Sequence, residues 1–356
     1  MGAAIARRQF LKNAAAVAGG VAGSRILGPA VGSTQGKELI AYYWYVPVFK
    51  EIFPQFEKET GIKIVSLGSY GGNPIWWTKM LAGEVWDFFV PSMDWLQRAA
   101  RADLLEPLDL RQIPNWKNLS DQGKKVTETE LSWGSKIYGV PFSMVINPLV
   151  WNTKRIPEKP DSWGSLWDPR YKGKISMKDE ARLAVMVAAL HTGQNPNSPS
   201  NWDQIKAVLL EQKKLVRKYW STHEEMAEMM ATEAAWLSQY TDGRVRKLQK
   251  EGVPVDFVVP KEGAPATIDA LAIPKKAKNK EAAHRFIDFI LRGDVMAKQM
   301  QIIGYATFNT ASYAAVSPEL RSKLAIAKEW KFAWRAHLAP ELLNKMDSLW
   351  LEVKLG

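Results

Sequence analysis

Beyond residue 36, the apolar residues of the first part of the chain alternate between strand-like and helix-like spacing. Residues 37–45 are largely apolar and aromatic and predict a strand. Residues 48–60 follow with large apolar side chains at helical spacing, among them Ile52 and Phe56, and end at Gly61, a residue type that commonly terminates helices. The same alternation predicts further strands at 62–67 and 86–90 and further helices at 73–81 and 92–101. Consecutive strand–helix units of this length indicate an α/β fold built on a parallel sheet.

A long extended run, residues 137–151, contains no helix signal and predicts a crossing from this first lobe into a second one. The second region again mixes strands with helices; the strands are expected at 174–177, 234–239 and 255–259, and the helices at 179–191, 201–218 and 224–231. The apolar run 267–273 is expected to return the chain to the first lobe, before helices at 280–291, 294–302 and over most of 318–356. We therefore expect lobe 1 to comprise residues 37–141 plus 268–311, and lobe 2 to comprise residues 142–267 plus 312–356.

Residues 1–32 have the composition of an export signal. Arg7 and Arg8 stand before Gln-Phe-Leu-Lys, a mild Ala- and Gly-rich stretch follows, and small residues end the segment near Gly32. The paired arginines resemble the twin-arginine (Tat) signal peptide, which predicts the Tat translocase as a partner during export and the periplasm as the destination. The segment has no Cys at its end, so we expect no lipid anchor. The alternative interpretation is a basic tail ahead of a helix.

The composition excludes several classes of site. The chain has no Cys, which removes disulfides, thiolate metal sites and Cys nucleophiles, and its four His residues are widely scattered, so no metal site is expected. The formal net charge of +11 comes from cations interleaved with acids rather than from one concentrated patch, so no nucleic-acid partner is expected. A length of 356 residues favours two domains over a single core.

An exported hydrolase is the alternative from another functional class. The adjacent acids Asp179 and Glu180 would point apart on a helix and cannot flank one bond. The chain contains no Gly-x-Ser-x-Gly elbow, no phosphate-binding loop and no His-Glu-x-x-His motif. We therefore expect no catalytic residues and no cofactor.

Candidate binding residues follow the predicted strands of the first lobe. Ligands of α/β sheets bind beyond the carboxyl ends of the strands, and here those positions hold Trp44 and Tyr45, Ser69 and Tyr70, and Ser92 and Asp94. Large aromatic side chains suit either a core or a stacked ligand, so these positions are the ones to inspect for ligand contact. Each residue also has a purely structural interpretation, since Trp44 can pack under the sheet, Ser92 can cap a helix and Asp94 can charge its first turn.

Several short sequence blocks carry a family resemblance. In chain order they are Val46-Pro, Phe56-Glu-Lys-Glu-Thr-Gly-Ile-Lys, Val90-Pro-Ser, Tyr138-Gly-Val-Pro, Ser162-Trp-Gly-Ser-Leu-Trp-Asp-Pro-Arg-Tyr-Lys-Gly-Lys, Pro260-Lys-Glu-Gly, Asp269-Ala-Leu-Ala-Ile-Pro, Ala277-Lys-Asn-Lys-Glu-Ala-Ala and Ile303-Gly-Tyr. Together they resemble the spermidine/putrescine-binding proteins of ABC importers over nearly all of the mature chain. The resemblance implies a periplasmic-binding-protein fold of two α/β lobes joined by two crossover strands, with a ligand cleft between them. It also implies a permease and ATPase complex of the inner membrane as partners, and we expect the receptor to be a monomer.

The resemblance also implies a set of cleft residues. Trp44, Tyr45, Ser92, Glu180 and Asp269 match positions of the family's cleft. Other positions depart from the family: Asp94 stands where an aromatic residue is common, Tyr240 replaces a Trp, Thr267 replaces an aromatic residue, Leu183 replaces a second acid and Lys331 replaces a neutral polar contact. The predicted ligand-binding residues are therefore Trp44, Tyr45, Ser92, Asp94, Glu180, Tyr240 and Asp269.

The charges of this set favour a cationic ligand but leave alternatives open. The carboxylates Asp94, Glu180 and Asp269 favour a small organic cation, a polyamine or a related amine. The departures from the family leave open an amino-acid-like zwitterion, a carboxylate or a sugar, and Lys331 would suit an anion. A ferric site would require clustered Tyr residues, and the pair Tyr42-Tyr43 does not meet that requirement.

Overall fold

The computed structural model describes residues 38–70, 72–324 and 330–356. The predicted signal, residues 1–32, lies outside these residues. Within the described part of the chain, no helix combines the length and the hydropathy needed to span a membrane.

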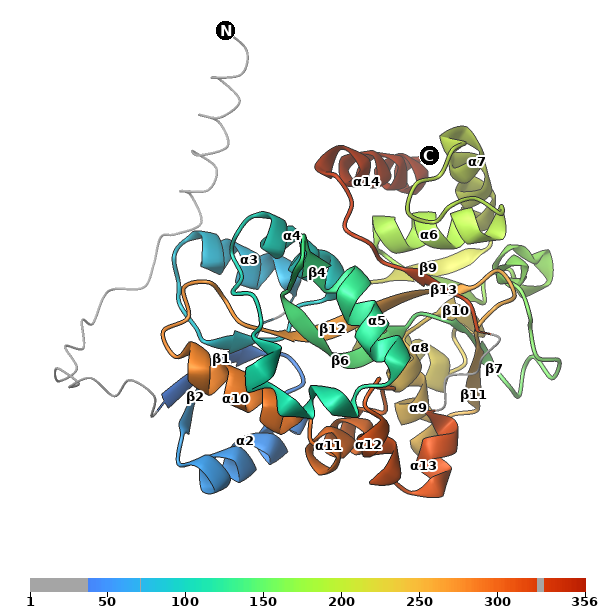
Figure 1. Cartoon of the computed structure of the whole chain (residues 1–356). Helices are drawn as coiled ribbons and strands as arrows, with labels where there is room; N and C mark the ends of the chain where they lie inside the picture. Colours follow the sequence, from blue (N-terminus) through green and yellow to red (C-terminus); the bar gives the residue numbers. More distant parts are fainter. Residues whose placement is uncertain (1–37, 71, 325–329) are drawn as a thin grey trace, which may run out of the picture. The chain divides into compact units, whose positions relative to one another are not determined.

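The first lobe is built on a sheet whose leading strands are each followed by a helix (Figure 1). Strands β1 (Glu38–Tyr43), β2 (Lys63–Ser69) and β3 (Phe88–Phe89) are parallel, in the spatial order β3-β1-β2. The helices that follow them are α2 (Val46–Thr60), α3 (Asn73–Leu81) and α4 (Met93–Arg101). Strand β12 (Ala264–Ala272) joins this sheet beside β3, and β13 (Phe332–Trp334) continues it beyond β12. The predicted strand–helix units and the α/β class are confirmed.

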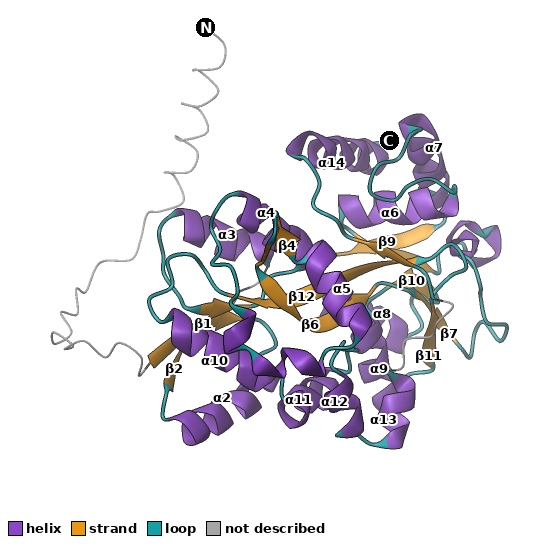
Figure 2. Ribbon diagram, in the orientation of Figure 1, coloured by secondary structure: helices purple, strands orange, loops and turns teal. Residues whose placement is uncertain are grey.

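The second lobe has its own five-stranded sheet. In spatial order its strands are β11 (Val255–Val258), β7 (Leu149–Asn152), β10 (Leu237–Gln239), β8 (Ile175–Lys178) and β9 (Val216–Trp220). Its helices are α6 (Ala181–His191), α7 (Trp202–Lys213), α8 (His223–Ala231) and α9 (Asp242–Lys250). The C-terminal helix α14 (Pro340–Leu355) packs against α6 and α7, where Trp350 and Val353 join an apolar cluster with Ala188 and Leu209 (Figure 2).

Two antiparallel neighbours connect the lobes. Strand β6 (Gly139–Ile146) is buried along its whole length and leads into β7, whereas β12 follows β11 and returns to the first sheet. The pairing of β6 with β12 shifts register between Asp269 and Ala270. An irregularity of this kind re-aims a side chain and is common beside functional sites. The two predicted crossover strands are therefore present, and Asp269 lies at the break in their pairing.

The helices after β12 return to the first lobe. Helices α10 (Lys280–Ile290) and α11 (Gly293–Ile303) pack against α2. Helices α12 (Thr310–Ala314) and α13 (Pro318–Lys323) pack on α11, where Met300, Val316 and Leu324 share one apolar cluster. The predicted boundary assigned residues 312–323 to lobe 2; within this stretch, Val316 is buried and Tyr313 and Leu320 are partly buried in the cluster that they share with Met300 of α11.

Short elements complete the first lobe. They are the helix α5 (Asp121–Glu130), the hairpin strands β4 (Ser132–Trp133) and β5 (Lys136–Ile137), and 3₁₀ turns at Leu110–Gln112 and Pro114–Asn118. The second lobe also contains 3₁₀ turns, at Trp163–Trp167 and Pro169–Tyr171.

Candidate functional site

A cavity of about 1170 Å³ lies between the two lobes. The first lobe contributes the turns that follow β1 and β3 and the start of α3. The second lobe contributes the β8–α6 turn and α9. Both crossover strands and the segment after β13 complete the walls. Most of these wall segments follow strands of the two sheets. The carboxyl-end rule for α/β sheets therefore places the cavity correctly.

The aromatic pair after β1 forms one corner of the cavity. Tyr45 has a left-handed backbone conformation, with φ of 61°, which is uncommon for a residue that carries a side chain. In this conformation its ring lies near Phe142 and Tyr305, and its hydroxyl donates a hydrogen bond to the carboxylate of Asp269. Backbone strain of this kind concentrates at binding sites, where the surrounding structure holds it.

The carboxylate of Asp269 is buried without a cation beside it. The residue is 7% exposed, and within the described part of the chain it forms no ion pair. Burial raises the pKa of Asp269 to about 7, with a further raising effect from the charge of Asp94; the hydrogen bond from Tyr45 and the charge of Arg335 act in the opposite direction. Near neutral pH, this carboxyl group is therefore divided between its neutral and ionised forms.

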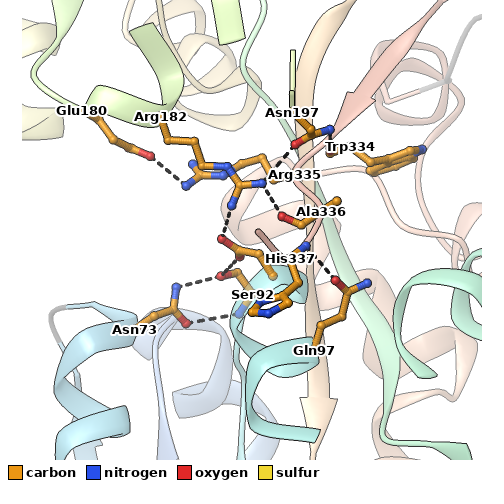
Figure 3. A network of polar contacts seen from close by, with 11 residues as sticks. Asn73, Ser92, Gln97, Glu180, Arg182, Asn197, Trp334, Arg335, Ala336 and His337 are labelled. Carbon is orange, nitrogen blue, oxygen red and sulfur yellow. Dashed lines mark hydrogen bonds and ion pairs between the residues drawn. The ribbon is translucent and has the colours of Figure 1, made fainter. Parts of the chain in front are cut away.

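Asp94 and Ser92, by contrast, belong to a hydrogen-bonded network that joins the lobes (Figure 3). The amide of Asn73 donates to the Ser92 hydroxyl (2.7 Å), which donates in turn to Asp94 (2.9 Å). The guanidinium of Arg182, on α6 of the second lobe, donates to Asp94 on α4 of the first lobe (2.9 Å) and to the carbonyl of Ala336. The charge of Asp94 is thus balanced within the protein.

Glu180 is likewise paired inside the protein. Its carboxylate lies 2.8 Å from the Lys178 ammonium and 2.8 Å from the Arg335 guanidinium. Burial alone would raise the pKa of Glu180, but the charges of Arg335 and Lys178 lower it to about 2. Glu180 therefore stays ionised, and two cations already neutralise it.

The structure brings most of the predicted residues together. Those that line the cavity are Trp44, Tyr45, Ser92, Asp94, Glu180 and Asp269. Tyr240 is not among the lining residues, because it is 1% exposed and packs edge-on against Trp220, with its hydroxyl donating to the carbonyl of His223. The side chain of His223 lines the wall in its place.

Sequence reasoning missed the cations of the cavity. Lys331 was the position considered for an anion, but Arg335, four residues later, lines the cavity, as do Lys178 and Arg182. Lys178 ends strand β8, so inspecting the carboxyl ends of the second sheet would have found it. Arg335 follows a three-residue strand in an irregular segment and gives no sequence signal.

Comparisons with known proteins agree with this architecture. The model of a family described as bacterial extracellular solute-binding protein matches residues 51–328. The chain is 29% identical over 305 residues to the spermidine/putrescine-binding periplasmic protein of Escherichia coli, with 84% of this chain and 86% of that protein covered. It is 31% identical over 291 residues to the spermidine/putrescine-binding periplasmic protein 1 of Haemophilus influenzae, with 80% and 79% covered.

A solved structure supports the fold. The spermidine/putrescine ABC transporter substrate-binding protein of Streptococcus pneumoniae superposes with a TM-score of 0.79 at 22% identity, over 90% of this chain and 99% of that one. At this identity the likeness concerns the fold alone. The described lobes therefore have the fold of that substrate-binding protein.

The environment of Asp269 predicts that Asp269→Asn stabilises the protein when no amine is present. The folded-state pKa of about 7 lies above the ordinary value of 3.8, so the contribution of this group to stability falls as the pH rises from about 4 to about 7. Asn carries no charge to bury and can still accept the hydrogen bond from Tyr45. We expect the variant to be more stable by about 2–4 kcal/mol at pH 8, and by less at pH 5.

Denaturant unfolding at both pH values measures this difference in the free energy of unfolding. The ionisable groups that act electrostatically with Asp269 are Tyr45, Tyr70, Tyr305, Asp94 and Arg335, and all remain in the variant. Asp347→Asn, at an exposed carboxylate of the same cavity, is the control and should change stability little. An Asp269→Asn variant less stable than the wild type at pH 8 would contradict the prediction.

Proposed function

We propose that this chain, which belongs to the bacterial extracellular solute-binding protein family, binds a small organic cation in the cavity between its lobes. As a member of that family it is a solute-binding protein of an ABC importer and not an enzyme. Such proteins bind a small ligand and deliver it to a membrane permease and its ATPase. The relatives named above are spermidine/putrescine-binding proteins, and an amine ligand for this chain is our inference from the site.

One observation carries the proposal: among the residues that the structure describes, Asp269 is the buried carboxylate of the cavity that forms no ion pair. Asp94 is paired with Arg182, and Glu180 is paired with Lys178 and Arg335. A buried ionised carboxylate is costly unless a partner compensates its charge. An ammonium group beside Asp269 would supply that charge and would keep the carboxyl group ionised.

The surroundings of Asp269 also suit an ammonium group. Trp44 and Tyr45 line the same cavity, and an aromatic face attracts a cation by roughly 0.5–2 kcal/mol. The Tyr45 hydroxyl already orients the Asp269 carboxylate, so the acceptor oxygens are held in place before a ligand arrives. Preorganisation of this kind lowers the entropy cost of binding.

A direct test measures the binding of simple amines to Asp269→Asn. Calorimetric titration with butylamine and putrescine should show affinity at least about tenfold weaker than for the wild type, because a charge-assisted hydrogen bond is lost. Asp203→Asn, at an exposed carboxylate outside the cavity, is the control and should bind both amines like the wild type. Unchanged affinity in Asp269→Asn would refute the ammonium site.

We further propose that the chain is exported by the twin-arginine route and acts as a monomer in the periplasm. The proposal depends on the Arg7-Arg8 pair and the Ala- and Gly-rich stretch behind it. The two named relatives are described as periplasmic proteins. Sedimentation velocity tests the oligomeric state. A dimer at micromolar protein concentration would contradict the proposed monomer.

The export route predicts that replacing both Arg7 and Arg8 by Lys blocks transfer to the periplasm. Tat signals require the arginine pair, whereas a general secretory signal requires only positive charge at this position. Fractionation of cells that express the full chain should show the variant retained in the cytoplasm and the wild type in the periplasm. Equal export of both would exclude the twin-arginine route.

A further inference from the structure

The cavity walls carry many charges of both signs. The lining includes four carboxylates, Asp94, Glu180, Asp269 and Asp347, and six cationic side chains, Arg98, Lys178, Arg182, Arg244, Lys247 and Arg335. Arg244 and Lys247 pair with Glu224 and Glu251, which lie beyond the lining, so the remaining four cations match the four carboxylates in number. A zwitterion keeps this balance, whereas a polyamine would add at least two positive charges.

Around Glu180, positive charge is locally in excess. Lys178 and Arg335 both pair with this one carboxylate, so the three groups together carry one net positive charge. Arg182 differs, because it is matched by Asp94 and donates further hydrogen bonds to Asn197 and Ala336. The two guanidinium groups lie beside one another (Figure 3), and burial together with the charge of Arg335 lowers the pKa of Arg182 to about 10.

Arg335 also has donor capacity that the protein does not use. Its side chain is 19% exposed and pairs with Glu180 through one terminal nitrogen, while its Nε has no hydrogen-bond partner among the described residues. Two other cavity-lining donors, Thr267 Oγ1 and Trp44 Nε1, are buried and likewise unpartnered within the described part of the chain. Buried polar groups without partners are rare and require a specific explanation.

These groups lie at a distance from Asp269 that one small molecule can span. The backbone N–H of Arg335 donates to the carbonyl of Ala266 on β12 (2.9 Å), and Asp269 follows three residues later on that strand. Three residues of strand cover about 10 Å. Thr267 lies between the two positions, and the side chains of all three line the same cavity.

We infer that Arg335 and Lys178 form an anion-binding subsite, so that the ligand is an amino acid whose carboxylate lies at this subsite and whose ammonium group lies at Asp269. The inference rests on the proposed ammonium site and adds a second requirement to it. The planar guanidinium group offers donors in the geometry that a carboxylate accepts, and the Lys178 ammonium adds a second charge. A diamine would place its second ammonium against these two cations instead.

Matched ligands separate the contribution of the carboxylate from that of the ammonium. For chains of four, five and six carbons, calorimetry compares the ω-amino acid with the alkylamine, the carboxylic acid and the diamine of the same length. We expect at least one ω-amino acid to bind more than about tenfold tighter than its alkylamine and its diamine, since one charge-assisted pair is worth that factor. If alkylamines and diamines bind as tightly as the ω-amino acids at every length, the anion subsite is refuted while the ammonium site stands.

Variants then show which residues cause the preference for the ω-amino acid over the alkylamine. Arg335→Gln and Lys178→Gln should each reduce the affinity for the ω-amino acid at least about fivefold, while the affinity for the alkylamine should not fall, because removing a cation from the wall cannot weaken the binding of an ammonium group. Arg170→Gln removes an arginine that pairs with Asp168 outside the cavity, and it should change none of these affinities. A preference for the ω-amino acid that survives both cavity variants would overturn the assignment to Arg335 and Lys178.

Two outcomes separate this inference from the proposed function. Binding of a carboxylic acid without binding of any amine would refute the ammonium site and support the anion subsite. Failure of every probe to bind would refute the proposed ligand class and this inference with it.

Discussion

The site depends on one constraint, which is that the ionised carboxylate of Asp269 is buried and requires a compensating charge. A register break in the pairing of the two crossover strands places this residue at the cavity wall. The Tyr45 hydroxyl orients the carboxylate but cannot neutralise it. The neighbouring acids differ because Arg182, Lys178 and Arg335 neutralise them. Among the described residues, Asp269 is therefore a buried carboxylate of the cleft at which a cation from outside would improve the electrostatics.

The second lobe contributes mainly through its cations. Arg182 reaches from α6 to Asp94 on α4, and the segment after β13 adds a hydrogen bond from the His337 backbone to Gln97 on α4 (Figure 3). A buried ion pair of this kind adds little net stability, because desolvation offsets the attraction. It does specify which surfaces meet when the lobes are together. Binding proteins with two lobes enclose their ligands by hinge motion, so contacts that join the lobes also set the shape of the cleft.

The sequence predicted the fold because the fold is encoded locally. Strand and helix periodicities alternate clearly from β1 to α4, and the crossover strands are long apolar runs. The stretch that contains α12 and α13 is the exception. Its packing depends on apolar contacts with α11, which the pattern of strands along the sequence does not reveal.

The candidate site was predictable only where it follows strand ends. Trp44, Tyr45, Ser92 and Asp94 follow the strands of the first sheet and do line the cavity. Arg335 could not be found, because its position depends on a short strand that pairs with β12 from far along the chain. Tyr240 also follows a strand, β10, but its ring packs into the core cluster with Trp220 rather than into the cavity. A strand end therefore predicts nearness to the cleft, while packing decides which side chains enter it.

The most direct measurement of the central claim is the number of protons released when an amine binds. Calorimetry of butylamine binding at pH 7, in two buffers with different enthalpies of ionisation, reports that number. A carboxyl group with a pKa of about 7 is half protonated at this pH, so an ammonium group that ionises it fully should release about half a proton. Equal binding heats in the two buffers would mean that no proton leaves on binding, and would contradict the account in which an ammonium group ionises a buried, partly protonated Asp269.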